Sequence, residues 1–128
     1  MNLHDNEFTG IPDSIGELKS LETLNLYDNE FTVLLENIGG LSSLTTLDID
    51  GNNISSLPKS LEELTSLTTL DATDNNLTEI EALLPSTVRL SIHQQTLSLN
   101  NFTYAGADVV IEDLPQITMY NRLSLIHI

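Results

Sequence analysis

The chain has 128 residues, no cysteine and a formal net charge of −15, because 19 acidic residues outnumber four lysines and arginines. This length suits one domain with a sizeable core. The absence of cysteine excludes disulfide bridges, zinc–thiolate sites and cysteine nucleophiles. The acidic balance argues against nucleic acid as a partner and favours a protein with a basic surface. No apolar run approaches the roughly 20 residues of a membrane-spanning helix, so we expect no membrane span in this chain.

Short alternating segments recur along the first 77 residues. A partial copy lies at 3–8, and three fuller copies follow at 21–31, 44–54 and 67–77. Apolar residues two apart, such as Leu24 and Leu26, predict a short strand with one buried face. Four asparagines fall at the same place in successive copies, always 23 residues apart: Asn6, Asn29, Asn52 and Asn75. Self-similarity at a fixed period of this size is the signature of a repeat protein.

Each strand is followed by a return segment with a different spacing of apolar residues. The return segments at 11–18, 34–41 and 57–64 carry apolar residues three to four positions apart. This spacing predicts a helical or 3-10 turn on the opposite side of each repeat. Pro12 and Pro58 stand where such a turn would begin, a position that suits the fixed φ of proline and its missing N–H donor.

The copies resemble the leucine-rich repeat, L-x-x-L-x-L-x-x-N-x-L, because the leucines and the asparagine recur in register. A degenerate copy follows at 87–97, where Gln95 replaces the asparagine. The resemblance covers residues 1–98 and implies an α/β repeat solenoid with a concave parallel sheet and short helical or 3-10 convex segments. In this family the asparagine bonds backbone groups of adjacent turns. The resemblance therefore implies that Asn6, Asn29, Asn52 and Asn75 form an inward structural ladder rather than a ligand site.

The pattern changes after residue 98. Alternation at 97–104 and the apolar run at 109–111 predict strands, so 99–122 is interpreted as a β-rich C-terminal cap or the start of a following domain. Residues 94–114 loosely resemble the β-rich junction after the repeats of internalin-like bacterial surface proteins. Residues 123–128 match the translation of a transposase adapter used in sequencing libraries. We interpret them as an artefact, with an ordinary apolar strand as the alternative, and expect the chain to be a fragment.

The side chains between the strand leucines would line the concave face in columns. We expect these columns to form the partner-binding surface, because solenoids of this kind present extended concave faces. The candidate partner-binding residues are Tyr27, Thr46, Asp48, Asp50, Thr69, Asp71 and His93. Tyrosine is a frequent interface anchor, and neighbouring carboxylates would be relieved by a cationic partner. Three carboxylates from two strands supply too few oxygens for Ca²⁺, so no metal site is predicted.

No catalytic constellation is recognisable. The histidines are scattered, no serine or threonine has an adjacent histidine with an orienting acid, and no phosphate-binding or zinc-protease motif occurs. We therefore expect a non-enzymatic protein-interaction module without cofactors. The preferred context is a bacterial cell-surface or secreted protein, hence an extracellular location. The alternatives are an intracellular, cytoplasmic scaffold and the recognition arm of a larger receptor or enzyme whose other parts lie outside this chain.

Overall fold

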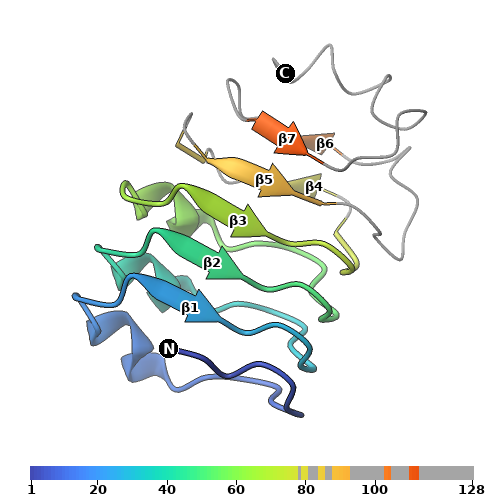
Figure 1. The fold of residues 1–128 in the computed structure, drawn as a ribbon, viewed down its shortest axis with the longest axis horizontal. Coiled ribbons are helices and arrows are strands. Elements are labelled where there is room, and N and C mark those ends of the chain that lie inside the picture. The colour runs from blue at the N-terminus through green and yellow to red at the C-terminus, as the bar shows by residue number, and fades with distance from the viewer. Residues whose placement is uncertain (78, 81–83, 86–87, 93–102, 105–109, 113–128) are drawn as a thin grey trace.

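The structure is a computed structural model that describes residues 1–77, 79–80, 84–85, 88–92, 103–104 and 110–112. The chain winds into stacked coils, and each coil contributes one strand to a parallel sheet (Figure 1). The sheet has the order β1-β2-β3-β5-β7, with bounds Thr23–Asn25, Thr46–Asp48, Thr69–Asp71, Arg89–Ser91 and Val110–Glu112. A second parallel pair joins β4 (Glu79–Ile80) to β6 (Thr103–Tyr104). The predicted repeat solenoid with a parallel sheet is confirmed.

Register in the sheet follows the sequence repeat. Thr23 pairs with Thr46, which pairs with Thr69, so one repeat of 23 residues advances the chain by one strand. Before β1, residue Asn2 forms a single parallel bridge with Asn25. The partial copy at 3–8 therefore belongs to the same stack. Because the register preserves side-chain direction, the same face of every strand points to the core.

The return segments form 3-10 helices: η1 (Asp13–Glu17), η2 (Glu36–Gly40) and η3 (Lys59–Glu63). Pro12 and Pro58 directly precede η1 and η3 in extended conformation, as their positions in the sequence predict. The helices of adjacent coils pack at backbone contact. A Cβ added at Gly40 would lie 2.4 Å from the carbonyl oxygen of Gly16. This close approach requires a residue without a side chain at that position.

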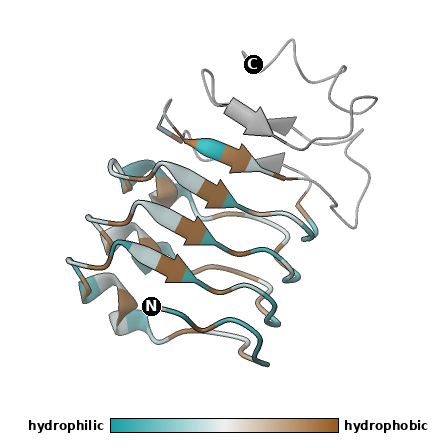
Figure 2. Ribbon diagram, viewed as in Figure 1, coloured by the Kyte–Doolittle hydropathy of each residue, from teal (hydrophilic) through white to brown (hydrophobic). Residues whose placement is uncertain are grey.

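Apolar side chains from both layers fill the interior of each coil. Figure 2 shows hydrophobic residues recurring at the same place in successive strands. Strand segments contribute fully buried Leu24, Leu26, Leu47, Ile49 and Leu70, and return segments contribute Leu41, Leu61 and Leu64. These residues form one continuous cluster that extends through successive coils to Leu90 and Ile92. A single repeat could not bury its apolar face alone, so the stack as a whole creates the core.

Three of the repeat asparagines lie inside this stack. Asn29, Asn52 and Asn75 are at most 6% exposed. The Nδ2 of Asn52 donates to the carbonyl oxygens of Leu26 in the preceding coil and Ile49 in its own coil, both at 3.0 Å. Its Oδ1 accepts the N–H of Phe31 at 3.1 Å. Each asparagine thus ties two coils together through backbone groups that would otherwise be buried without partners.

Asn6 differs from the other three, because its side chain is exposed. Its Nδ2 donates to Leu3 and His4 carbonyl oxygens within the same turn. These are the bonds that Asn29 makes within its own coil, to Leu26 and Tyr27. In this structure Asn29, Asn52 and Asn75 join successive coils, and the place of Asn6 in the predicted inward ladder stays a prediction.

Two described strands fall within the segment expected to be β-rich. In particular, β7 pairs with β5 and so continues the concave sheet beyond residue 98. The second sheet of β4 and β6 was not foreseen, since the dipeptide Glu79–Ile80 is too short to show alternation. The boundary at 98 stays a prediction. The suspected adapter at 123–128 lies outside the described residues.

Candidate protein-binding face

The solvent side of β1, β2 and β3 carries the predicted columns of side chains. Register places Thr23, Thr46 and Thr69 side by side at the start of the strands. A second column at the strand ends contains Asn25, Asp48 and Asp71. A third lies two residues further on, where Tyr27, Asp50 and Thr73 follow in successive coils. We call these three columns the concave face. Neighbouring strands are about 4.8 Å apart, so side chains in one column are close neighbours.

The side chains of the second column also hold the turn that follows each strand, which was not predicted from the sequence. In each coil its side-chain oxygen accepts the backbone N–H two residues later, at 3.0 Å: Asn25 from Tyr27, Asp48 from Asp50, and Asp71 from Thr73. This Asx turn bends the chain away from the strand. The recurrence of Asn or Asp at the strand end is a signal that could have revealed it. One oxygen of Asp48 and one of Asp71 are therefore already engaged.

Burial and repulsion by neighbouring carboxylates act together on the side chain of Asp50. Burial, and after it repulsion by the carboxylates of Asp71, Asp48, Asp74 and Asp28, raise the pKa of its carboxyl to about 6. Every one of these causes acts in the same direction. Burial also raises the pKa of Asp48, although the hydrogen bond from the Asp50 N–H and the nearby His4 partly oppose that rise. The centre of the concave face thus holds negative charge at an energetic cost.

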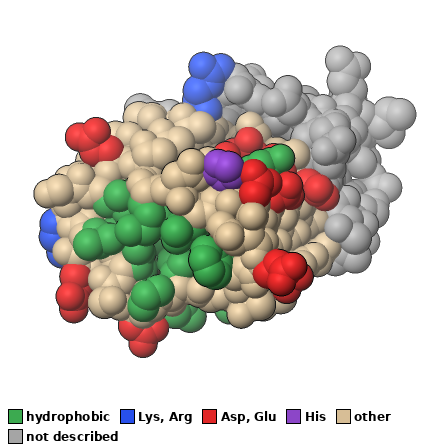
Figure 3. All heavy atoms as spheres, turned by 60° about the horizontal axis from the view of Figure 1, so that its bottom comes forward, with side chains coloured by type: hydrophobic (Ala, Val, Ile, Leu, Met, Phe, Trp, Pro, Cys, Tyr) green, Lys and Arg blue, Asp and Glu red, His purple; other side chains and the backbone are tan. Residues whose placement is uncertain are grey.

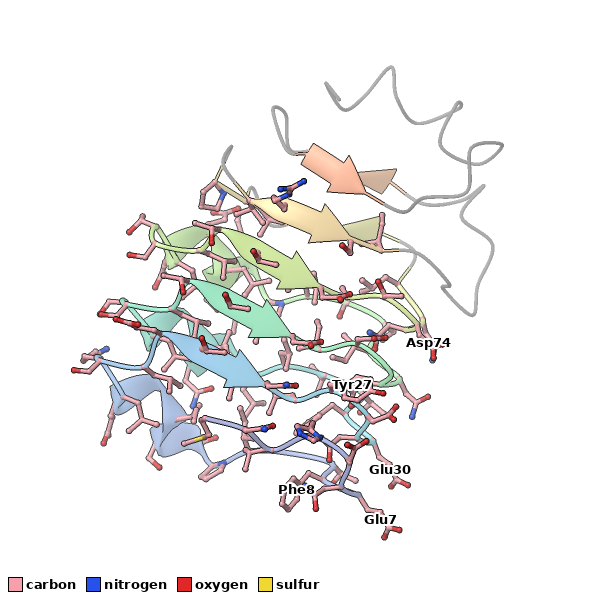
Figure 4. The ribbon with its side chains drawn as sticks, in the orientation of Figure 1. Glu7, Phe8, Tyr27, Glu30 and Asp74 are labelled. Carbon is pink, nitrogen blue, oxygen red and sulfur yellow. The ribbon has the colours of Figure 1, made fainter. Side chains whose placement is uncertain are left out.

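An aromatic group stands beside these carboxylates. The ring of Tyr27 lies 6.1 Å from that of His4, centroid to centroid. His4 in turn contacts Asp5, with 2.5 Å between Nδ1 and Oδ2. The carboxylates of Asp28 and then Asp5 raise the pKa of the Tyr27 hydroxyl above its ordinary value. Figure 4 shows Tyr27 just beyond the end of β1, where its ring borders the acidic part of the face.

The residue after the third column adopts a left-handed backbone in each of the four coils where the structure describes it. Asp5, Asp28 and Asp74 have φ of 57°, 53° and 51°, and Gly51 has φ of 69°. Aspartate and glycine tolerate this conformation better than most residues. The turn itself therefore explains the residue types in this column. Their charge nevertheless adds to the acidic field around Tyr27 and Asp50.

Six of the seven predicted partner-binding residues come together on adjacent coils. They are all half-buried: Tyr27, Thr46, Asp48, Asp50, Thr69 and Asp71. The seventh, His93, lies outside the described residues. His4 stands one repeat before Tyr27 in the same column and was not among the predicted residues, although its ring lies beside that of Tyr27. The predicted set contained no residue of the partial copy at the start of the chain.

Among the residues that the structure describes, no group of three histidines or carboxylates is arranged to hold a metal ion. An open hollow of about 840 Å³ beside the concave face is lined by Asp5, Asn6, Glu7, Phe8, Asp28, Asn29 and Glu30. Within the described ranges, no helix is long and apolar enough to cross a membrane.

The coiled architecture, the asparagine ladder and the parallel sheet define a repeat protein with a broad open face. Comparison of the sequence with known families adds the family: the leucine-rich repeat pattern matches residues 1–54 and 35–77. Together these ranges span more than half of the chain. The chain belongs to the leucine-rich repeat family, whose members generally serve as binding modules for other proteins rather than as enzymes.

No curated protein sequence matches this chain. Solved structures with similarity to it include a leucine-rich repeat protein of Leptospira interrogans, which is 20% identical with a TM-score of 0.46. That alignment covers 99% of this chain and 47% of the Leptospira protein. The chain therefore spans about half the length of the structure it matches.

Proposed function

We propose that this protein is a protein-interaction module that binds a basic protein surface on its concave face. The observation that carries the proposal is the row of aspartates at Asp48, Asp50 and Asp71, where burial first, and then repulsion from the neighbouring carboxylates, raises the pKa of Asp50 to about 6. A cationic side chain seated among them would relieve that repulsion. The proposal includes no catalytic step, metal or cofactor, and it excludes nucleic acid as the partner because the net charge is −15.

The residues of the face have distinct roles in this proposal. Tyr27 supplies a large rigid side chain with a polar tip, which suits an interface anchor. The second oxygens of Asp48 and Asp71 pair with cations of the partner, while their first oxygens hold the Asx turns. Thr46 and Thr69 offer hydroxyls on the neighbouring column.

A binding experiment can separate this face from the overall charge. The triple variant Asp48→Asn, Asp50→Asn, Asp71→Asn removes three charges and keeps an acceptor for each Asx turn, as Asn25 does naturally in the first coil. The matched control Glu22→Gln, Glu36→Gln, Glu63→Gln removes three charges from exposed positions outside the concave face. Cytochrome c, a compact basic protein, serves as the probe in a biosensor titration at low salt.

We expect the concave-face variant to weaken binding at least about tenfold, and the control to weaken it less than about threefold. Binding of the native chain should also weaken as salt rises, since the attraction is screened. Equal losses in the two variants would mean that net charge alone attracts the probe. In that case the concave face would have no special part in binding, and the proposal would fail.

We also propose that the module belongs to a bacterial cell-surface or secreted protein, so that its location is extracellular. The support is the loose resemblance of residues 94–114 to the junction of internalin-like surface proteins. A long-read sequence of the native locus tests this context. A secretion signal upstream and an anchoring domain downstream are expected. A short frame with neither would support the cytoplasmic scaffold instead, and a kinase domain downstream would support the recognition arm of a receptor.

A further inference from the structure

The carboxyl of Asp50 lies at the centre of a group of aspartates that three successive coils bring together. The other members come from its own coil, from the preceding coil and, in two cases, from the following coil: Asp48, Asp28, Asp71 and Asp74. A Cβ added at Gly51 would lie 2.5 Å from Oδ1 of Asp28. The carboxylate of Asp28 therefore reaches across to the residue directly after Asp50.

Asp50 differs from its neighbours on the concave face in its hydrogen bonds. Oδ1 of Asp48 accepts the N–H of Asp50, and Oδ1 of Asp71 accepts that of Thr73, both at 3.0 Å. Such bonds favour the charged form of a carboxyl. Within the described residues, no N–H donates to the carboxyl of Asp50, and burial and repulsion both favour its protonated form. Asp50 therefore takes up a proton more readily than Asp48.

The remaining groups around Asp50 supply no positive charge to it. Tyr27 and Thr73 occupy the equivalent positions in the coils on either side, and the pKa of the Tyr27 hydroxyl is raised above its ordinary value, so it stays neutral. His4 acts on the carboxyl of Asp48, whereas the charged groups that act on Asp50 are all carboxylates. Figure 3 shows several acidic side chains gathered beside a histidine, with the lysine and arginine side chains apart from them in this view. A proton is therefore the cation that relieves the repulsion when no partner is bound.

We propose that the concave face is acid-sensitive, because a proton and a cation of the partner compete for the carboxylate of Asp50. This inference rests on the function proposed above and adds its regulation. When Asp50 is ionised, the face presents its full charge and binds the partner. Acidification neutralises the centre of the face and releases the partner. Since coupling between two ligands is reciprocal, binding of the partner must also expel a proton.

The pKa of Asp50 sets the size of the effect. With a pKa of about 6, nearly all Asp50 carboxyls are ionised at about pH 7.5, but only about one in eleven is ionised at about pH 5. A partner that requires the ionised form therefore binds about tenfold more weakly at the lower pH. The fold should persist there, because a carboxyl whose pKa is raised by folding stabilises the folded state when it is protonated. Acid thus acts on binding and leaves the fold in place.

Biosensor titrations of the full chain with an oligoarginine peptide, its ends blocked, test the proposal at about pH 5 and 7.5. The probe keeps its charge over this range, since guanidinium groups do not titrate there. We expect the native chain to bind at least about fivefold more weakly at the lower pH. Asp50→Asn should bind weakly at both, with a difference below about twofold. Asp13→Asn is the matched control, because it removes one charge from an exposed position outside the concave face and should keep the native pH dependence.

Calorimetry provides a second readout that does not depend on comparing the affinities of variants. At about pH 6 roughly half of the Asp50 carboxyls are protonated, so binding of the peptide should release about half a proton. Binding enthalpies in two buffers with different enthalpies of ionisation measure this number. Asp50→Asn should release clearly less. His4→Gln removes the nearby histidine and should release as much as the native chain, because His4 acts on Asp48.

The acid sensitivity and the function it rests on fail in different ways. If the triple variant Asp48→Asn, Asp50→Asn, Asp71→Asn binds the peptide as tightly as the native chain at the higher pH, the proposed function fails and the regulation fails with it. If the triple variant binds weakly but the native affinity is equal at both pH values, only the acid sensitivity is overturned. The same conclusion follows if Asp50→Asn keeps the native pH dependence while His4→Gln loses it. Loss of the far-UV circular dichroism signal at the lower pH would show that acid acts on the fold, which also overturns the inference.

Discussion

Asp48 accepts a hydrogen bond from the backbone N–H of Asp50, with 3.0 Å between the nitrogen and Oδ1. The same two carboxyls repel each other, and Asp48 contributes to the raised pKa of Asp50. Asp48 thus stabilises the backbone at Asp50 and at the same time disfavours the charged form of the Asp50 carboxyl. Column position alone suggested a binding role, but the structure shows that Asp48 first shapes the turn that presents Asp50.

The Asx turn can be tested at Asp48. We expect Asp48→Ala to lower the free energy of unfolding by about 1 kcal/mol, because the N–H of Asp50 loses its acceptor. Asp48→Asn should be neutral or slightly stabilising, since it keeps Oδ1 and removes a repelling charge. Urea denaturation of the two variants measures both values. Equal destabilisation by alanine and asparagine would show that charge matters here and the turn does not.

Asn52 should be much more important to stability than Asn6. Its amide makes bonds to Leu26, Ile49 and Phe31 in the buried interior. Asn52→Ala leaves several of these groups without partners, so we expect a loss of more than about 2 kcal/mol. Asn6→Ala removes bonds only from an exposed turn, and a loss below about 1 kcal/mol is expected. Denaturant melts that give similar losses for the two would contradict the ladder.

Stability should fall as the pH rises through the mildly acidic range. The pKa of Asp50 is about 6 in the folded protein and 3.8 as the ordinary value. The folded state therefore holds this proton more tightly than the unfolded state does. Its stabilising effect is complete below about pH 4 and is lost as the pH passes about 6. Asp48, whose pKa is also raised, contributes in the same direction.

Thermal melts between about pH 4.5 and 8 measure this dependence, and Asp50→Asn provides the control. The variant should melt at a higher temperature than the native chain at pH 7.5, and its melting temperature should change less with pH. A native chain whose stability rises steadily over this range would refute the assignment. An unchanged slope in Asp50→Asn would place the responsible group elsewhere.

At the left-handed turn position, we expect substitution by a β-branched residue to destabilise the protein and substitution by glycine to have little effect. Gly51 has φ of 69°, and a Cβ there would lie 2.5 Å from Oδ1 of Asp28. We expect Gly51→Val to cost about 2 kcal/mol or more, because a β-branched residue is strained in this conformation. Asp74 is the equivalent residue one coil later, and Asp74→Gly should change the free energy of unfolding by less than about 1 kcal/mol. Denaturant melts compare the two, and a harmless valine would refute the strain.

Periodicity made most of this fold predictable. The 23-residue spacing of Asn29, Asn52 and Asn75 set the repeat, and apolar spacing separated strands from 3-10 segments. Pro12 and Pro58 correctly marked two helix starts. Elements too short to show a period, such as β4, could not be found in this way.

The sequence by itself determined which residues share a face, since strand direction and repeat length follow from local periodicity. It also determined the acidic character of that face. Only the tertiary structure decided what the shared positions do. Stacking raised the pKa of Asp50 by bringing separate coils together, and it buried Phe31 and the amide of Asn52 between coils. These differences arise from contacts between coils, and residues at equivalent repeat positions carry no sign of them.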